Sequence, residues 1–171
     1  MPKPLPATYA PHFDNYIKLV PEEDLIAAIK AQQPVIDRYF DTISEEGSMY
    51  AYAEGKWTLK EMLQHIIDAE RIFCFRALAF ARKEPHSVPG FEEDDYAQNS
   101  KANNRTWKSL CDELKAVRNA SILLFESFTS EMLNSPGTGN GKPCTANAMG
   151  FVMVGHLNHH KNIIEERYMI N

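Results

Sequence analysis

Three of the six histidines, His156, His159 and His160, lie within five residues near the end of the sequence. Residues four apart on an α-helix differ by about 40° in direction and about 6 Å in height, so the imidazoles of His156 and His160 can converge on one point. Paired histidines at this spacing bind zinc in helices that carry the HExxH motif. The spacing therefore predicts that His156 and His160 share a metal ion.

The residues around this pair indicate that it faces the protein interior. Steps of three and four residues from Met149 lead through Met153, His156 and His160 to Ile163. On an amphipathic helix these positions form one apolar face, which packs against the core. The two histidines thus occupy positions where leucine or isoleucine would be expected.

A third ligand is available upstream, where His65 lies on a helical seam with Met62, Ala69 and Ile72. Three neutral imidazoles suit zinc, nickel or iron, and they leave coordination positions open for water or a substrate. A lone inward histidine is more often a hydrogen-bonded core residue, and a structural role for His65 is the alternative.

Three further features near the histidines could take part in the chemistry. His159 competes with His160 as the second ligand of the helix, but we expect it at the surface or beside the ligands. Asp68, one turn after His65, could orient an imidazole or accept a proton, and an exposed helix carboxylate is the alternative. The acidic run from Glu92 to Asp95 is expected to be a solvated loop or the entry to the helix that starts near Asn103, not a second metal site.

The elements that would position these residues are four long amphipathic helices. They are expected over Pro21–Ser44, from Thr58 to about Lys83, from about Asn103 to before Asn134, and from Thr145 to about Tyr168. Thr58 and Glu61 match a capping box, and Pro34 should kink the first helix. The pattern predicts an all-α fold, a four-helix bundle with long crossing connections.

The segments between and before the helices are rich in proline and glycine. Residues 1–20 contain four prolines and are expected to form an extended arm, which leaves residues 21–171 as a single bundle domain. We expect a crossing loop over His86–Gln98 and a flexible loop over Asn134–Pro143. No segment shows the alternation that is typical of a strand.

Composition excludes several classes of function. The chain of 171 residues has 18 basic and 23 acidic side chains, a net charge of −5, and no basic stripe of the kind that binds nucleic acid. No apolar run is long enough for a membrane helix, and the N-terminus lacks the apolar core of a signal peptide, so a cytoplasmic protein is expected. Three widely spaced cysteines form neither a disulfide framework nor a zinc knuckle.

Several short motifs together resemble the DinB-like superfamily, which includes the DNA-damage-inducible and YfiT-like metalloenzymes and not the polymerase of the same name. The matching elements are Gly55-Lys56-Trp57-Thr58, His65 with the following Ile66 to Arg71, Pro89-Gly90-Phe91 with its acidic run, and Gly155 to His160. They span about 100 residues in the expected order. Each motif is short, and their order and spacing carry the resemblance.

The resemblance implies a four-helix bundle whose metal is bound by one histidine of the second helix and two of the last. On this chain these are His65, His156 and His160, with water or a small molecule completing the coordination. The resemblance also implies a homodimer. Relatives of this kind include enzymes that transfer low-molecular-weight thiols, enzymes that isomerise thiol adducts, and proposed hydrolases, and the fold does not choose among these activities.

These observations lead to one functional hypothesis and one alternative. The hypothesis is a cytoplasmic metal-dependent enzyme, of hydrolase or thiol S-transferase type, that acts on a small molecule such as a thiol. A divalent cation held by neutral imidazoles keeps its full charge and can activate a bound water or thiol. The alternative is a non-catalytic helical metal-binding or interaction module of a stress response.

Overall fold

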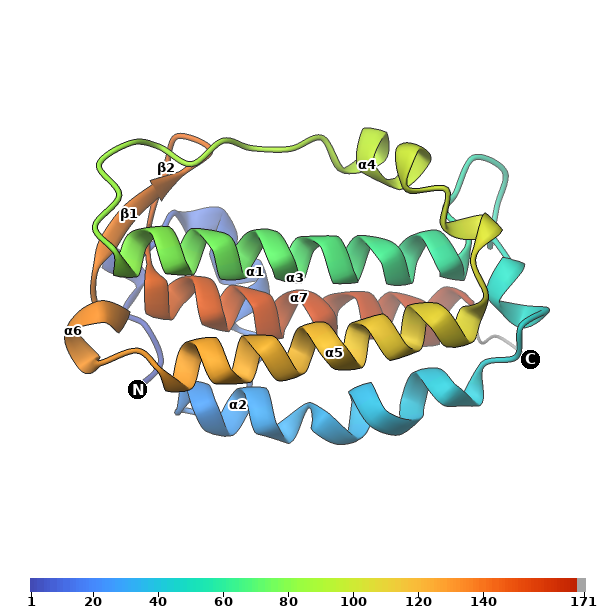
Figure 1. Cartoon of the computed structure of the whole chain (residues 1–171), viewed down its shortest axis with the longest axis horizontal. Helices are drawn as coiled ribbons and strands as arrows, with labels where there is room; N and C mark the ends of the chain where they lie inside the picture. Colours follow the sequence, from blue (N-terminus) through green and yellow to red (C-terminus); the bar gives the residue numbers. More distant parts are fainter. Residues whose placement is uncertain (169–171) are drawn as a thin grey trace.

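Four helices lie side by side in the computed structural model, which describes residues 1–168 (Figure 1). They are α2 (Leu25–Ala31), α3 (Leu59–Ala81), α5 (Trp107–Glu126) and α7 (Ala146–Arg167). Helix α3 packs against both α5 and α7, and α2 is extended by a π-helical turn over Val35–Tyr39. The predicted all-α four-helix bundle is therefore confirmed.

The helices that carry the candidate ligands begin where the sequence predicts. The Thr58 hydroxyl accepts from the Glu61 backbone N–H at 3.2 Å, and the Glu61 carboxylate accepts from the Thr58 N–H at 2.9 Å, which completes the capping box. Thr145 caps α7 in the same way, accepting from the backbone N–H of Ala148 at 3.2 Å. These caps fix the register of α3 and α7, and with it the direction of their histidines.

The first bundle helix is shorter and less regular than the prediction of one helix over Pro21–Ser44. The α-helix starts at Leu25, after Asp24 as its cap, and ends at Ala31. Pro34 has no N–H to donate and crowds the preceding turn, which interrupts a regular α-helix. The chain continues as the π-helical turn and a 3-10 turn over Phe40–Thr42.

The prediction of an extended N-terminal arm over residues 1–20 is wrong in its second half. A 3-10 turn over Pro11–Phe13 leads into a short helix, α1 (Asp14–Ile17), which packs against α7. A Cβ atom at Gly155 would lie 2.1 Å from the backbone oxygen of Tyr16. Because glycine has no Cβ, Gly155 lets the backbone of α1 rest directly on α7.

The two long connections contain regular structure that the sequence-based prediction missed. The crossing segment after α3 includes helix α4 (Glu93–Ser100), and a short helix α6 (Ser130–Leu133) follows α5. The predicted flexible loop Asn134–Pro143 contains a hairpin of β1 (Pro136–Gly139) and β2 (Lys142–Thr145).

The hairpin has a two-residue turn, Asn140 and Gly141, whose φ angles are 51° and 69°. Positive φ at both positions is the type I′ conformation, for which Asn-Gly is the preferred sequence. The sequence therefore held a strand signal that the search for apolar alternation could not detect.

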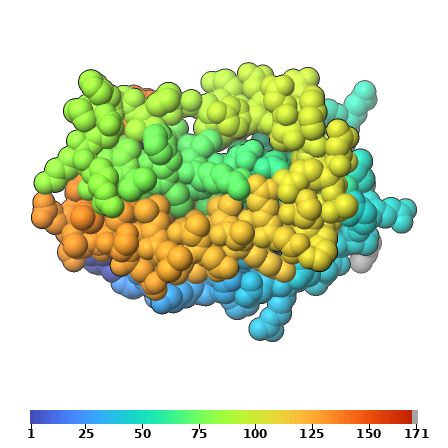
Figure 2. All heavy atoms as spheres, in the orientation of Figure 1, coloured from blue at the N-terminus to red at the C-terminus, as the bar shows by residue number. Residues whose placement is uncertain are grey.

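The hairpin and the crossing segment are bonded to each other. The Val88 N–H donates to the Thr138 carbonyl at 2.9 Å, and the Asn140 N–H donates to the Val88 carbonyl at 2.8 Å. Further along, helix α4 contacts α3, and Figure 2 shows a hollow between α3 and the crossing segment.

A polar cluster is buried between the four helices. The guanidinium of Arg118 (α5) donates to both carboxylate oxygens of Glu70 (α3) at 2.9 and 2.8 Å, and to the side-chain oxygen of Gln32 at 2.8 Å. Gln32 in turn donates to the Val154 carbonyl of α7 at 2.7 Å. The cluster thus joins α3, α5, α7 and the end of α2 by hydrogen bonds.

Among residues 1–168, no helix combines the length and the apolar character needed to cross a membrane.

Candidate metal centre

The structure brings together the three histidines singled out in the sequence. His65 extends from α3, and His156 and His160 extend from successive turns of α7, and all three are buried. The Nε2 atom of His156 lies 3.1 Å from the Nε2 atom of His65 and 3.1 Å from that of His160. Three potential ligand atoms therefore meet at one point between two helices.

The spacing of these nitrogens fits a transition metal. With metal–nitrogen bonds of about 2.0–2.1 Å, two ligands at octahedral to tetrahedral angles lie about 2.9–3.4 Å apart. The two distances of 3.1 Å from His156 fall within this interval, and all three ligand atoms lie within 4.8 Å of one another. A neutral imidazole has one N–H, so hydrogen bonding alone leaves lone pairs crowded at this point, and one cation would satisfy all three.

Burial keeps the three imidazoles in the neutral form that binds metals. It lowers the pKa of His65 to about 4 and that of His160 to about 2, and it also lowers the pKa of His156 well below its usual value. The neighbouring imidazoles add to the effect at His156 and His160, because two cations would repel each other. At neutral pH each Nε2 can therefore offer a lone pair.

His159 lies outside this cluster. Its ring packs edge-on against Tyr16, with the ring centres 5.6 Å apart, and burial lowers its pKa. On the other side it contacts the ring of His160 at 5.1 Å. Of the two candidates on α7, His160 joins His156 and His65, and His159 flanks them.

Asp68, the other candidate of the sequence analysis, is engaged elsewhere. Its carboxylate accepts a hydrogen bond from the Gln64 amide at 2.9 Å and lies 3.8 Å from the guanidinium of Arg71. Within residues 1–168 it makes no hydrogen bond to any of the three histidines. No contact supports a role for Asp68 in orienting His65.

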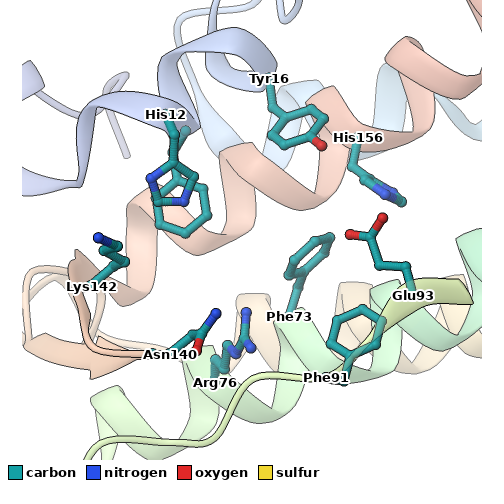
Figure 3. A pocket seen from close by; sticks show the side chains of 11 residues that line it. His12, Tyr16, Phe73, Arg76, Phe91, Glu93, Asn140, Lys142 and His156 are labelled. Carbon is teal, nitrogen blue, oxygen red and sulfur yellow. The ribbon is translucent and has the colours of Figure 1, made fainter. Parts of the chain in front are cut away.

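A pocket of about 290 Å³ opens beside His156 (Figure 3). Its aromatic walls are Phe73 of α3, Tyr16 of α1 and Phe91 of the crossing segment. The Phe73 and Tyr16 rings contact the imidazole of His156, with centres 5.3 and 5.5 Å apart. The histidine cluster thus adjoins, through His156, a cavity large enough for a small molecule.

Helix α4 brings acidic side chains close to the cluster. Glu93 lines the pocket, and Figure 3 shows its carboxylate extending toward His156. Burial, and the neighbouring charges of Asp94 and Glu92, raise the pKa of Glu93. Asp94 acts on His65, where its negative charge partly offsets the lowering of the pKa.

The sequence analysis expected the Glu92–Asp95 run to be solvated. Its side chains remain partly exposed to solvent, but residues 93–95 form the first turn of α4, a separate helix that precedes α5, and not a loop. Three acidic residues in the first turn of a helix are a start signal, because they interact favourably with the helix dipole. The approach of Glu93 to His156 depends on the tertiary path of the crossing segment, which no local signal reveals.

Comparison with known proteins identifies the family of the chain. The model of the DinB superfamily matches residues 28–164, a span that contains all three histidines. The chain belongs to the DinB superfamily. No curated protein sequence matches it.

A solved structure similar to this DinB-superfamily chain is that of YfiT from Bacillus subtilis. The match covers 96% of this chain and 90% of the YfiT chain, with 16% sequence identity and a TM-score of 0.66. YfiT is described as a probable metal-dependent hydrolase with an unusual four-helix bundle topology. At this identity the likeness establishes the shared bundle.

Proposed function

We propose that this DinB-superfamily protein is a metal-dependent enzyme of hydrolase or thiol S-transferase type, with a small molecule as its substrate. His65, His156 and His160 would hold a divalent transition metal. The observation that carries the proposal is the meeting of three buried Nε2 atoms beside a pocket. The description of YfiT as a probable metal-dependent hydrolase supports it.

A bound divalent cation would act as a Lewis acid and lower the pKa of a water or thiol that reaches it. The chain's own residues then have two tasks. Phe73 and Phe91 provide apolar walls that exclude water from one side of the substrate. Glu93 offers a carboxylate, the kind of group that can take and return a proton at this end of the pocket.

The nucleophile in this proposal comes from outside the chain. Burial raises the pKa of Cys74, Cys111 and Cys144 to about 12 in each case, so these thiols stay protonated at neutral pH. A thiol attacks as its thiolate, and none of the three supplies one. Water would make the enzyme a hydrolase, and a small thiol would make it an S-transferase.

The first test is metal content. The purified protein is loaded with zinc, nickel or iron(II), desalted and analysed by elemental mass spectrometry. We expect about one metal ion per chain for at least one of these metals, none in His65→Ala, and an unchanged content in His159→Ala, the matched control on the flank of the cluster. Wild-type protein that retains no metal would contradict the proposal.

The second test separates the two reaction types. The loaded protein is assayed for hydrolysis of p-nitrophenyl acetate, and for the reaction in which a small thiol displaces chloride from 1-chloro-2,4-dinitrobenzene. We expect acceleration of one reaction and its loss in His65→Ala. A stoichiometric metal with neither reaction accelerated, across a panel of esters, amides and electrophiles, would instead support the non-catalytic metal-binding module.

A further inference from the structure

The charged side chains of the pocket are separated into two ends. Figure 3 shows Glu93 beside His156 at one end, and His12, Arg76 and Lys142 at the other. The ring of Phe73 lies between the two groups. One end is therefore acidic and adjoins the histidine cluster, and the other is basic and lies away from it.

Arg76 is the central residue of the basic end, and it is buried without a carboxylate partner. Only 6% of its surface is exposed, and its Nε–H has no hydrogen-bond acceptor. One terminal nitrogen donates to the carbonyl of Pro89 at 3.1 Å. Among residues 1–168, no acidic side chain forms an ion pair with it. Burial lowers its pKa, which shows that the charge is poorly solvated.

A buried guanidinium without a counter-ion is unfavourable in a folded protein, because the charge has lost its water. The hydrogen bond to Pro89 satisfies one donor of a side chain that has five. A purely structural role, linking α3 to the crossing segment, therefore leaves the buried Nε–H without an acceptor. Its position in the pocket wall allows a ligand to supply the missing acceptor.

The surroundings hold Arg76 in place and bring further donors to it. A Cβ atom at Gly139 would lie 3.2 Å from Cδ of Arg76, so the hairpin packs directly against the arginine stem. The side chain of Asn140, at the hairpin turn, also lines the pocket. The hydrogen bonds of Val88 to the hairpin fix this arrangement, and a site that is already formed binds without an ordering cost.

We propose that Arg76, together with Lys142 and His12, binds an oxyanion, the carboxylate or phosphate group of the substrate. The planar guanidinium can donate two parallel hydrogen bonds to either group, and Lys142 adds a second positive charge.

The inference rests on the proposed function, because it assigns the orientation of the substrate in the same pocket. The anionic group lies at the basic end, and the reacting group lies beside His156. The carboxylate of Glu93 disfavours the reverse orientation by like-charge repulsion. The substrate is thus a small molecule with a negative charge at one end and an electrophilic or thiol group at the other.

Anion binding is tested on protein without added metal, so the result does not depend on the histidine cluster. Inorganic phosphate and acetate are titrated separately, and NMR follows the Arg76 Nε–H and the backbone amides of Asn140 and Gly141. We expect saturable shifts at these positions with at least one anion. If phosphate binds and acetate does not, the substrate carries a phosphate, and the converse result indicates a carboxylate.

The variants are matched in charge. Arg76→Gln should weaken the binding about tenfold or more, since hydrogen bonds between charged groups contribute roughly 1.5–3 kcal/mol. Arg82→Gln removes the same charge from an exposed position near the end of α3 and should leave the affinity unchanged. Lys142 is exposed, so Lys142→Gln should fold normally and weaken binding by a smaller factor.

Equal affinity in wild type, Arg76→Gln and Lys142→Gln, or an absence of saturable shifts with both anions, would overturn the anion subsite. His65→Ala separates this outcome from failure of the proposed function. We expect that variant to lose the metal and to bind the anion as wild type does. If wild-type protein binds the anion but holds no metal, the anion subsite is supported and the proposed metal-dependent enzyme is contradicted.

Discussion

Two buried arginines of the same bundle have opposite surroundings. Arg118 is fully buried, and its donors are matched by both oxygens of Glu70 and by Gln32. Arg76 is almost as buried, yet the only hydrogen bond of its side chain in the described chain is to the carbonyl of Pro89. The first lies between helices, and the second lines a pocket.

The difference indicates which buried charge serves the fold and which serves a ligand. The cluster around Arg118 is closed, because Ser121 donates a further hydrogen bond to Glu70 at 2.7 Å and Gln32 is bonded to α7. Such a cluster specifies how the helices pack. Arg76 and His156 instead line one cavity, and the Nε–H of Arg76 has no acceptor there, as expected of a binding site without its ligand.

The largest expected effect comes from breaking the closed cluster. Glu70→Ala leaves the guanidinium of Arg118 buried without its counter-ion, and we expect the free energy of unfolding to fall by about 3–5 kcal/mol. Urea denaturation followed by circular dichroism measures it. The control is Glu113→Ala, which removes a partly exposed partner of Arg71 between the same two helices. This variant should lower the free energy of unfolding by about 1 kcal/mol or less. Equal losses in the two variants would mean that Arg118 gains nothing from its closed surroundings.

The histidine cluster should affect the free energy of unfolding mainly through the metal that it binds. A metal at 100 times its dissociation constant should stabilise the wild type by about 2.7 kcal/mol in the same urea measurement. His160→Ala should remove this gain, and His159→Ala should keep it. A gain that survives in His160→Ala would place the stabilising metal elsewhere in the molecule.

Arg76 should contribute little to stability despite its burial. Arg76→Met keeps the stem against Gly139, loses the hydrogen bond to Pro89 and removes a poorly solvated charge, so the free energy of unfolding should change by about 1 kcal/mol or less. A loss as large as that of Glu70→Ala would show that Arg76 is a structural arginine like Arg118, and the contrast between the two would disappear.

The smallest effect concerns the charges at the basic end of the pocket. Burial lowers the pKa of His12, and the charge of Lys142 lowers it further. Lys142→Gln should therefore raise this pKa, although burial should keep it below 6.5. Proton NMR of the His12 ring over a pH series measures the change. An unchanged pKa would place the two charges too far apart to share one ligand.

The same shift sets the sign of a pH effect on stability. Because the pKa of His12 is lower in the folded protein, the unfolded chain binds the proton more readily at mildly acidic pH. The stability that His12 contributes is complete above pH 6.5, the ordinary histidine value. It is lost as the pH falls through the lowered pKa of the folded state.

The parts of the site that follow from the sequence are those encoded by local spacing. The capping box at Thr58 fixes the start of α3, and the four-residue spacing of His156 and His160 fixes their common direction on α7. The position of His65 relative to them needs only two helices packed side by side. The bundle and the composition of the histidine cluster could therefore be anticipated from short-range patterns.

The parts that were missed depend on contacts between distant segments. Glu70 and Arg118 are ordinary charged helix residues in sequence, and only their pairing across 48 positions makes their burial possible. Arg76 and Glu93 become pocket residues because the crossing segment folds back over α3. The hairpin differs, because its turn, Asn140-Gly141, is a local sequence signal. It was missed because the flanking strands contain glycine and proline and show no apolar alternation.

Gly155 has a consequence for how this protein can diverge from its relatives. The close contact that it allows brings Tyr16, and with it His12, into the wall of the pocket. The superfamily match begins only at residue 28, so it includes the three histidines and leaves this wall out. In the proposed enzyme, substitutions in the first 20 residues would change this wall of the pocket, and with it the choice of substrate, while the three histidines stay as they are.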